Sequence, residues 1–285
     1  MAEEVILTYE YDATSNIYTV YQGEYLQTAF DEAELTSSAE HPATIKIMKD
    51  MTIVGEPDEY GDVWEDLNVN NSVIILDLNG RTITGSGASI VFHLGETNSA
   101  TLTIDDSSEN KSGKIVGVQN AMYLIGVEGG STLIVNNGTF EGTYYGVYSV
   151  GESVSNTING GTFKSNGYPI YAQTSSLTIT GGTFEGGEAA LAFSTDSNNA
   201  LITGGCFTGG EYDISTGGKT GFLSYNEEGT GATFPGGLSI YYPTLTDLLA
   251  NGAAYYDSSG NQLTLADAAT SCEGDVTVKK IPTDE

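Results

Sequence analysis

Apolar and polar residues alternate in short runs along most of the chain, and the runs recur at a nearly constant spacing. Between residues 131 and 210 one pattern appears four times, as STLIVNNGTFEG, SNTINGGTFKS, SLTITGGTFEGG and ALITGGCFTGG. Its phenylalanines stand 23, 21 and 23 residues apart, at Phe140, Phe163, Phe184 and Phe207. Repeats of this length, built from β-branched runs and paired glycines, predict a solenoid in which each repeat forms one coil.

Aligning the coils on these phenylalanines gives two further apolar positions in each coil. Seven residues after the Phe lie Val147, Ile170, Leu191 and Ile214. With Ile83 and Ile115 in the Phe place of earlier coils, the same step reaches Ile90 and Met122. Before the Phe lie Val135, Ile158, Ile179 and Ile202, with Leu78 and Ile104 in the earlier coils. Three inward-facing segments per coil predict an all-β fold, a right-handed parallel β-helix of about eight coils, with the glycine pairs at its bends.

The N-terminal region departs from the repeat and is predicted to cap the solenoid. Residues 5–25 alternate in polarity as two short strands, and Leu26–Ser38 carries apolar residues at helical spacing. An amphipathic helix placed there would cover the open end of the first coil. Residues 55–71 are acidic and lack apolar periodicity, so we expect a side loop between the first two coils.

The pattern stops again after Phe234. We expect a short helix over Leu245–Leu249, a hairpin over Ala254–Asp267 and a last strand over Asp275–Ile281. The predicted organisation is therefore an N-terminal cap (residues 1–42), a parallel β-helix (43–238) and a C-terminal cap (239–285).

The charge of the chain narrows the range of partners. There are 38 acidic residues against 9 Lys and Arg, which gives a formal net charge of −29. Nucleic acid is excluded because binding phosphates requires clustered basic residues. Anionic polysaccharides would be repelled unless a divalent cation bridged them. We expect no membrane insertion, since no long apolar run is present, and the acidic start Met1–Glu4 is unlike a secretory signal. An exported form would then have lost its signal.

Two motifs carry a resemblance to known proteins. By Ile74–Gly85 (IILDLNGRTITG) and the recurring N-G-G-T-F-x-G, the chain resembles the pectin lyase-like right-handed β-helix superfamily. More narrowly, it is similar to G-G-T-F repeat proteins that gut Gram-positive bacteria secrete or attach to their walls, which often end in a segment like LTDLLANGAAYYDSSGN. The resemblance implies the fold and an extracellular or cell-surface location. Its residues are folding residues, so it implies little about chemistry.

An enzymatic function is the alternative interpretation. Hydrolases of this superfamily combine paired acidic residues with a G-H-G and an R-x-K, and here neither His41 nor His93 lies in a G-H-G. Asp77 and Asp105 lie on neighbouring rungs and form the best acid–base pair, with Arg81 nearby. They define a divergent polysaccharide lyase or glycoside hydrolase site, and Ca²⁺ would enter only under the lyase alternative. Otherwise we expect no cofactor or metal, with Asp77 a strand residue and Asp105 a turn residue.

A binding function is the favoured interpretation. Tyr123, Tyr148 and Tyr171 each follow the inward position of their coil, so strand alternation predicts one outward row on successive rungs. Exposed aromatic faces about one rung apart can pack against sugar rings. The row therefore suggests a non-catalytic secreted or cell-surface protein that binds a glycan or another surface component of host or bacterium. The other interpretation is that these tyrosines only shield the sheet.

The two cysteines allow at most one disulfide. Cys206 occupies the Thr position of the G-G-T-F motif, so we expect it to face outward. A bond to Cys272 would fix the C-terminal cap to the coils, and an unpaired outward Cys206 is the alternative. They lack C-x-x-C spacing, so we expect no metal site at these cysteines.

Overall fold

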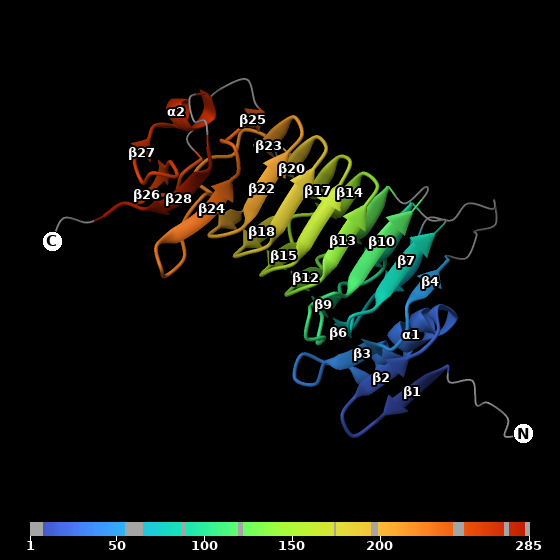
Figure 1. The fold of residues 1–285 in the computed structure, drawn as a ribbon. Coiled ribbons are helices and arrows are strands. Elements are labelled where there is room, and N and C mark those ends of the chain that lie inside the picture. Colours follow the sequence, from blue (N-terminus) through green and yellow to red (C-terminus); the bar gives the residue numbers. More distant parts are fainter. Residues whose placement is uncertain are drawn as a thin grey trace, which may run out of the picture.

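The chain forms a parallel β-solenoid of about eight turns, as predicted, with a helix at its N-terminal end (Figure 1). The structure is a computed structural model. It describes residues 8–54, 65–86, 89–118, 122–173, 175–194, 199–241, 248–270 and 274–282. Each central coil contributes one strand to each of three sheets, here named A, B and C.

The three sheets run along the solenoid axis, and strands of successive coils are neighbours within each. In order, sheet A consists of β1 (Tyr9–Asp12), β2 (Ile17–Val20), β3 (Ala43–Ile47), β6 (Val73–Asp77), β9 (Thr101–Asp105), β12 (Thr132–Val135), β15 (Ser155–Ile158), β18 (Ser176–Ile179) and β21 (Ala200–Ile202). Sheet B consists of β4 (Met51–Ile53), β7 (Thr82–Ser86), β10 (Lys114–Val118), β13 (Thr139–Gly142), β16 (Thr162–Ser165), β19 (Thr183–Gly186), β22 (Cys206–Gly209), β24 (Thr230–Phe234), β28 (Val276–Lys280), β26 (Ala253–Tyr256) and β27 (Gln262–Leu263). Sheet C consists of β5 (Glu65–Val69), β8 (Ile90–Leu94), β11 (Tyr123–Val127), β14 (Tyr145–Val150), β17 (Tyr168–Gln173), β20 (Ala189–Phe193), β23 (Tyr212–Ser215) and β25 (Ile240–Tyr241).

The repeated phenylalanines form a stacked column inside sheet B. Phe140, Phe163, Phe184 and Phe207 are fully buried, with ring centroids 4.5, 5.2 and 4.8 Å apart along the column. Parallel in-register pairing places identical residues one rung apart, which is why the rings can stack. The second glycine of each pair takes the left-handed backbone that the bend requires, as at Gly161 (φ 95°).

A helix covers the N-terminal end of the column, as predicted. α1 (Leu26–Thr36) follows the short 3-10 helix η1 (Gly23–Tyr25) and buries Leu26, Ala29, Phe30 and Ala33. The Phe30 ring meets Phe92 of the first coils edge-on at 6.3 Å. The two predicted strands before it are β1 and β2, which pair antiparallel.

The expected side loop is wrong in its second half. Residues 65–69 form β5, the first strand of sheet C, and bury Leu67 and Val69. Only two apolar side chains mark this strand, too few for the polarity pattern to reveal. Residues 55–64 lie outside the part of the chain that the structure describes.

The C-terminal region closes sheet B with antiparallel strands. β28 pairs with β24 and with β26, and β26 and β27 form the predicted hairpin. The hairpin ends earlier than expected because α2 (Leu265–Thr270) begins there. Thr264 and Asp267 cap that helix reciprocally through backbone N–H groups and side-chain oxygens. Most of the predicted helix over Leu245–Leu249 lies outside the described residues.

Candidate functional site

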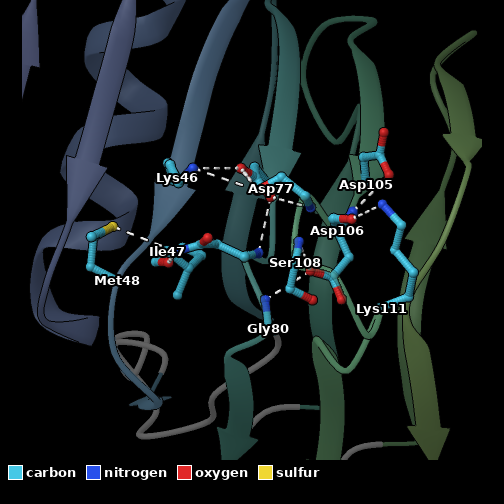
Figure 2. Close-up of polar contacts among 11 residues, drawn as sticks. Lys46, Ile47, Met48, Asp77, Gly80, Asp105, Asp106, Ser108 and Lys111 are labelled. Carbon is cyan, nitrogen blue, oxygen red and sulfur yellow. Dashed lines mark hydrogen bonds and ion pairs between the residues drawn. The ribbon is translucent and has the colours of Figure 1, made fainter.

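The acidic residues of the enzymatic alternative lie together at a bend between sheets A and B. Asp77 and Asp105 are directly paired in the register of β6 and β9. Figure 2 shows the Asp77 carboxylate directed toward Lys46, on the side away from Asp105. Lys46 Nζ lies 3.4 Å from one Asp77 oxygen, and the backbone N–H and hydroxyl of Ser107 donate to the same carboxylate at 2.8 and 2.7 Å. Asp77 is thus occupied in joining neighbouring coils.

The adjacent Asp106 is fully buried and has the same structural role. Its carboxylate accepts hydrogen bonds from the backbone N–H groups of Gly80, Ser108 and Gly113, at 2.7, 3.0 and 2.6 Å. Burial opposes ionisation of Asp106, but these hydrogen bonds outweigh it and lower the pKa of the carboxyl group. Asp106 therefore stays ionised and holds the bend.

The pKa of Asp105 is lowered, like that of Asp106. Partial burial acts to raise the pKa of Asp105, whereas hydrogen bonds from Asn137 and the Asp106 N–H lower it, and the net shift is downward. A general acid needs a raised pKa near the working pH, so this shift is in the wrong direction for proton donation. Arg81 is exposed, and among the described residues no ion pair joins it to Asp77 or Asp105. Hydrogen bonds within the bend thus occupy the carboxylates of Asp77 and Asp105.

The described part of the chain contains neither a cluster of metal-ligating side chains nor a membrane-spanning helix. Among the described residues, no group of three or more His, Cys, Asp or Glu side chains is placed to hold a metal ion. No helix in the described part of the chain is long and apolar enough to cross a membrane.

The predicted tyrosine row is wrong in register at one position. Tyr148 and Tyr171 are direct partners in β14 and β17, but Tyr123 of β11 pairs with Tyr145. The partner of Tyr148 in β11 is Gly126. The constant step of seven residues fails in the earlier coils, where Phe92 and Ile125 take the inward position of Val147. Ile90 and Met122 do not: Ile90 is partly exposed, and Met122 is 43% exposed.

The outer surface of sheet C instead carries two neighbouring columns of tyrosines. One column contains Tyr123, Tyr145 and Tyr168, with ring centroids 5.1 and 5.7 Å apart. The other contains Tyr148 and Tyr171, stacked at 5.4 Å. Rings of the two columns meet edge-on, and Tyr144 packs edge-on against Tyr145 and Tyr168. We call this half-buried cluster the tyrosine face: Tyr123, Tyr144, Tyr145, Tyr148, Tyr168 and Tyr171.

Hydrogen bonds hold the hydroxyl groups of Tyr144, Tyr148 and Tyr168 in the tyrosine face. Tyr144 and Tyr168 both donate to the carboxylate of Glu188, and Tyr148 donates to Gln173 at 3.0 Å. Burial, together with the neighbouring Tyr144 and Tyr123, raises the pKa of Tyr145 to about 12. The Tyr145 hydroxyl is neutral at physiological pH, as an ordinary tyrosine is, and the raised pKa keeps it a hydrogen-bond donor at alkaline pH as well.

A pocket of about 210 Å³ opens at the N-terminal end of the tyrosine face. It lies where Gly126 interrupts the outward column between His93 and Tyr148. We call it the Gly126 pocket; its lining residues are Ile90, His93, Tyr123, Gly126, Val127, Glu128, Tyr148 and Val150. Nε2 of the buried His93 lies 2.7 Å from the Glu128 carboxylate, whose side chain is 40% exposed. Aromatic, aliphatic and carboxylate groups thus converge on one cavity.

Several residues of this site were missed from the sequence. Tyr145 and Tyr168 could have been found, because each stands three residues before Tyr148 or Tyr171 and repeats with its coil. His93 and Glu128 are contributed by coils whose bends differ in length. No spacing rule in the sequence brings these two residues together.

Cys206 lies in register with Thr183, as the repeat predicts, and no cysteine among the described residues is bonded to it. Partial burial, followed by nearby carboxylates, raises the pKa of this thiol, which disfavours a nucleophilic role. Cys272 lies outside the described residues, so its pairing with Cys206 stays a prediction.

No protein-family model, curated protein or solved structure matches this chain.

Proposed function

We propose that this chain is a non-catalytic secreted or cell-surface protein that binds glycans through the tyrosine face. The observation that carries the proposal is the set of five half-buried tyrosines on the outer side of sheet C, with Tyr144 packed edge-on against them. Their stacking fixes the rings before any ligand arrives, so binding costs little side-chain entropy. Aromatic rings with a few fixed polar groups are suited to the apolar and hydroxyl faces of sugars.

We also infer a distant relationship to the pectin lyase-like superfamily, and more narrowly to the G-G-T-F repeat surface proteins of gut Gram-positive bacteria. The three-sheet parallel solenoid and the LDLNG sequence at Leu76–Gly80 support this inference. Such proteins work outside the cell, in agreement with the strongly acidic composition. The hydrogen bonds that occupy Asp77 and Asp105 favour the binding function over catalysis.

Titration against a panel of plant and mucin glycans tests the proposal. We expect binding of at least one neutral glycan with no new reducing ends and no unsaturated product. Tyr148→Ala should weaken that binding about tenfold or more, since it removes a central ring of the face and about 1.4 kcal/mol corresponds to a factor of ten. Tyr11→Ala is the matched control, because Tyr11 is an exposed tyrosine on β1.

Two outcomes would contradict the proposal. One is that no glycan of the panel binds the folded protein. The other is product formation that Asp105→Asn abolishes, which would establish the lyase or hydrolase alternative at Asp77, Arg81 and Asp105.

A further inference from the structure

The stacking of the tyrosine face restricts where a ligand can reach the flat side of a ring. Within each column the rings lie nearly parallel, at 5° for Tyr123 and Tyr145 and 12° for Tyr148 and Tyr171. Neighbouring rings therefore cover each other's faces, and Tyr145, between Tyr123 and Tyr168, presents a ring edge outward. Only the ends of the columns can offer a ring face.

One such end is the Tyr148 end of the second column, where the next residue in the column is Gly126. It is the partner of Tyr148 in the adjacent strand and has no side chain to stack on the Tyr148 ring, so the neighbour of that ring in β11 is Tyr123, which meets it edge-on at 4.9 Å. On the far side of Gly126 stands His93, and Ile90 lies next to Tyr123 in the other column. The Gly126 pocket is the space between these side chains.

The size and charge of the pocket define its occupant. Pockets for drug-sized ligands measure about 300–1,000 Å³, so a cavity of about 210 Å³ accommodates a single ring-sized unit. Its lining has one carboxylate, one imidazole and no Lys or Arg, in a chain of net charge −29. An anionic ligand would lack a cationic partner there. The exposed Glu128 carboxylate can instead accept hydrogen bonds from two adjacent hydroxyl groups.

We propose that the Gly126 pocket is the specificity subsite of the tyrosine face and binds one neutral sugar unit. The sugar's apolar C–H face packs on Tyr148 and Tyr123, and its hydroxyls donate to Glu128. His93 positions that carboxylate through the 2.7 Å contact from Nε2. This inference rests on the proposed glycan-binding function and adds the location and the charge selectivity of binding.

Isothermal titration with pairs of methyl glycosides tests the charge selectivity. The probes are methyl galactoside and methyl glucoside, each compared with the uronic acid that differs only in a carboxylate at C6. We expect at least one neutral glycoside to bind and its uronic acid to bind at least tenfold more weakly. Equal or tighter binding of the uronic acid would overturn the proposal.

Three variants test the location. Gly126→Leu should abolish glycoside binding, because the new side chain fills the pocket. The backbone of Gly126 is not left-handed, so a side chain there causes no backbone strain. Its Cβ would lie 3.2 Å from the Ile90 side chain, which must shift slightly. Glu128→Gln leaves the size of the pocket nearly unchanged and should weaken binding about tenfold, because it removes the negative charge of the hydrogen-bond acceptor. Ser215→Leu is the control, because it adds the same side chain in the same outward column, beyond Ala192.

The outcomes separate this inference from the proposed function. If polymeric glycans bind and Tyr148→Ala weakens them, but Gly126→Leu and Glu128→Gln both bind like the parent protein, the subsite is wrong and the glycan-binding function stands. If no glycan binds the parent protein, both proposals fail. Near-ultraviolet circular dichroism of the tyrosine cluster confirms that each variant is folded.

Discussion

Asp106 shows how a single carboxylate can hold a bend of the solenoid. It is fully buried, and three backbone N–H groups converge on it from Gly80, Ser108 and Gly113. Both oxygens act as acceptors, so an amide at this position must turn an N–H group toward an N–H donor. A short sequence such as D-D-S-S suggests a turn, but it does not reveal which carboxylate lies inside.

We expect Asp106→Asn to lower the free energy of unfolding by about 1–3 kcal/mol at pH 7, because a buried donor loses its acceptor. The pKa of Asp106 is lowered in the folded state. Its stabilising contribution is therefore present above the ordinary carboxyl pKa and is lost as pH falls through the lowered folded-state value. Urea denaturation at neutral and acidic pH should show the difference between the two proteins shrinking on acidification.

Glu40→Gln is the control for this experiment, because Glu40 is exposed and its removal should leave stability nearly unchanged at every pH. A difference between Asp106→Asn and the parent protein that stays constant down to strongly acidic pH would contradict the assigned role.

At the scale of the strands, the phenylalanine column couples neighbouring coils of sheet B. Phe163 is fully buried and stacks between Phe140 and Phe184. Phe163→Ala should cost about 3–5 kcal/mol, since it removes a large side chain and leaves a cavity that rigid coils cannot close. Urea denaturation followed by circular dichroism measures the loss. Lys164→Ala is the matched control, because the next residue forms only an exposed ion pair with Glu185. Equal urea midpoints for the two variants would show that the phenylalanine column does not contribute to stability.

The register of the strands explains which parts of the fold were predictable. In the later coils seven residues separate the inward positions of sheets B and C, as from Phe140 to Val147, and the sequence predicts that pairing correctly. In the earlier coils the same interval is longer, as from Ile115 to Ile125. Segments that connect strands generally run over a protein surface and tolerate insertions, so the interval across a bend varies more than the spacing within a strand. An error of a few residues there moved Tyr123 into the wrong column and hid His93, Gly126 and Glu128.

The electrostatics of the whole molecule follow from an excess of acidic residues on an elongated body. With 38 acidic and 9 basic side chains, most carboxylates cannot find a cationic partner. The strands hold these charges at fixed spacing, whereas unfolding lets them separate. Self-repulsion therefore destabilises the folded solenoid, and the stacked core must outweigh it.

Salt should consequently stabilise this protein. Raising NaCl from about 10 mM to about 150 mM shortens the Debye length from about 30 Å to about 8 Å and screens repulsion between coils. Differential scanning calorimetry should show the melting temperature rising by several degrees, since each kcal/mol corresponds to about 2–4 °C for a chain of this size. Choline chloride at equal ionic strength should have the same effect. A rise confined to calcium chloride would instead indicate a specific cation site, and a constant or falling melting temperature would show that self-repulsion does not limit stability.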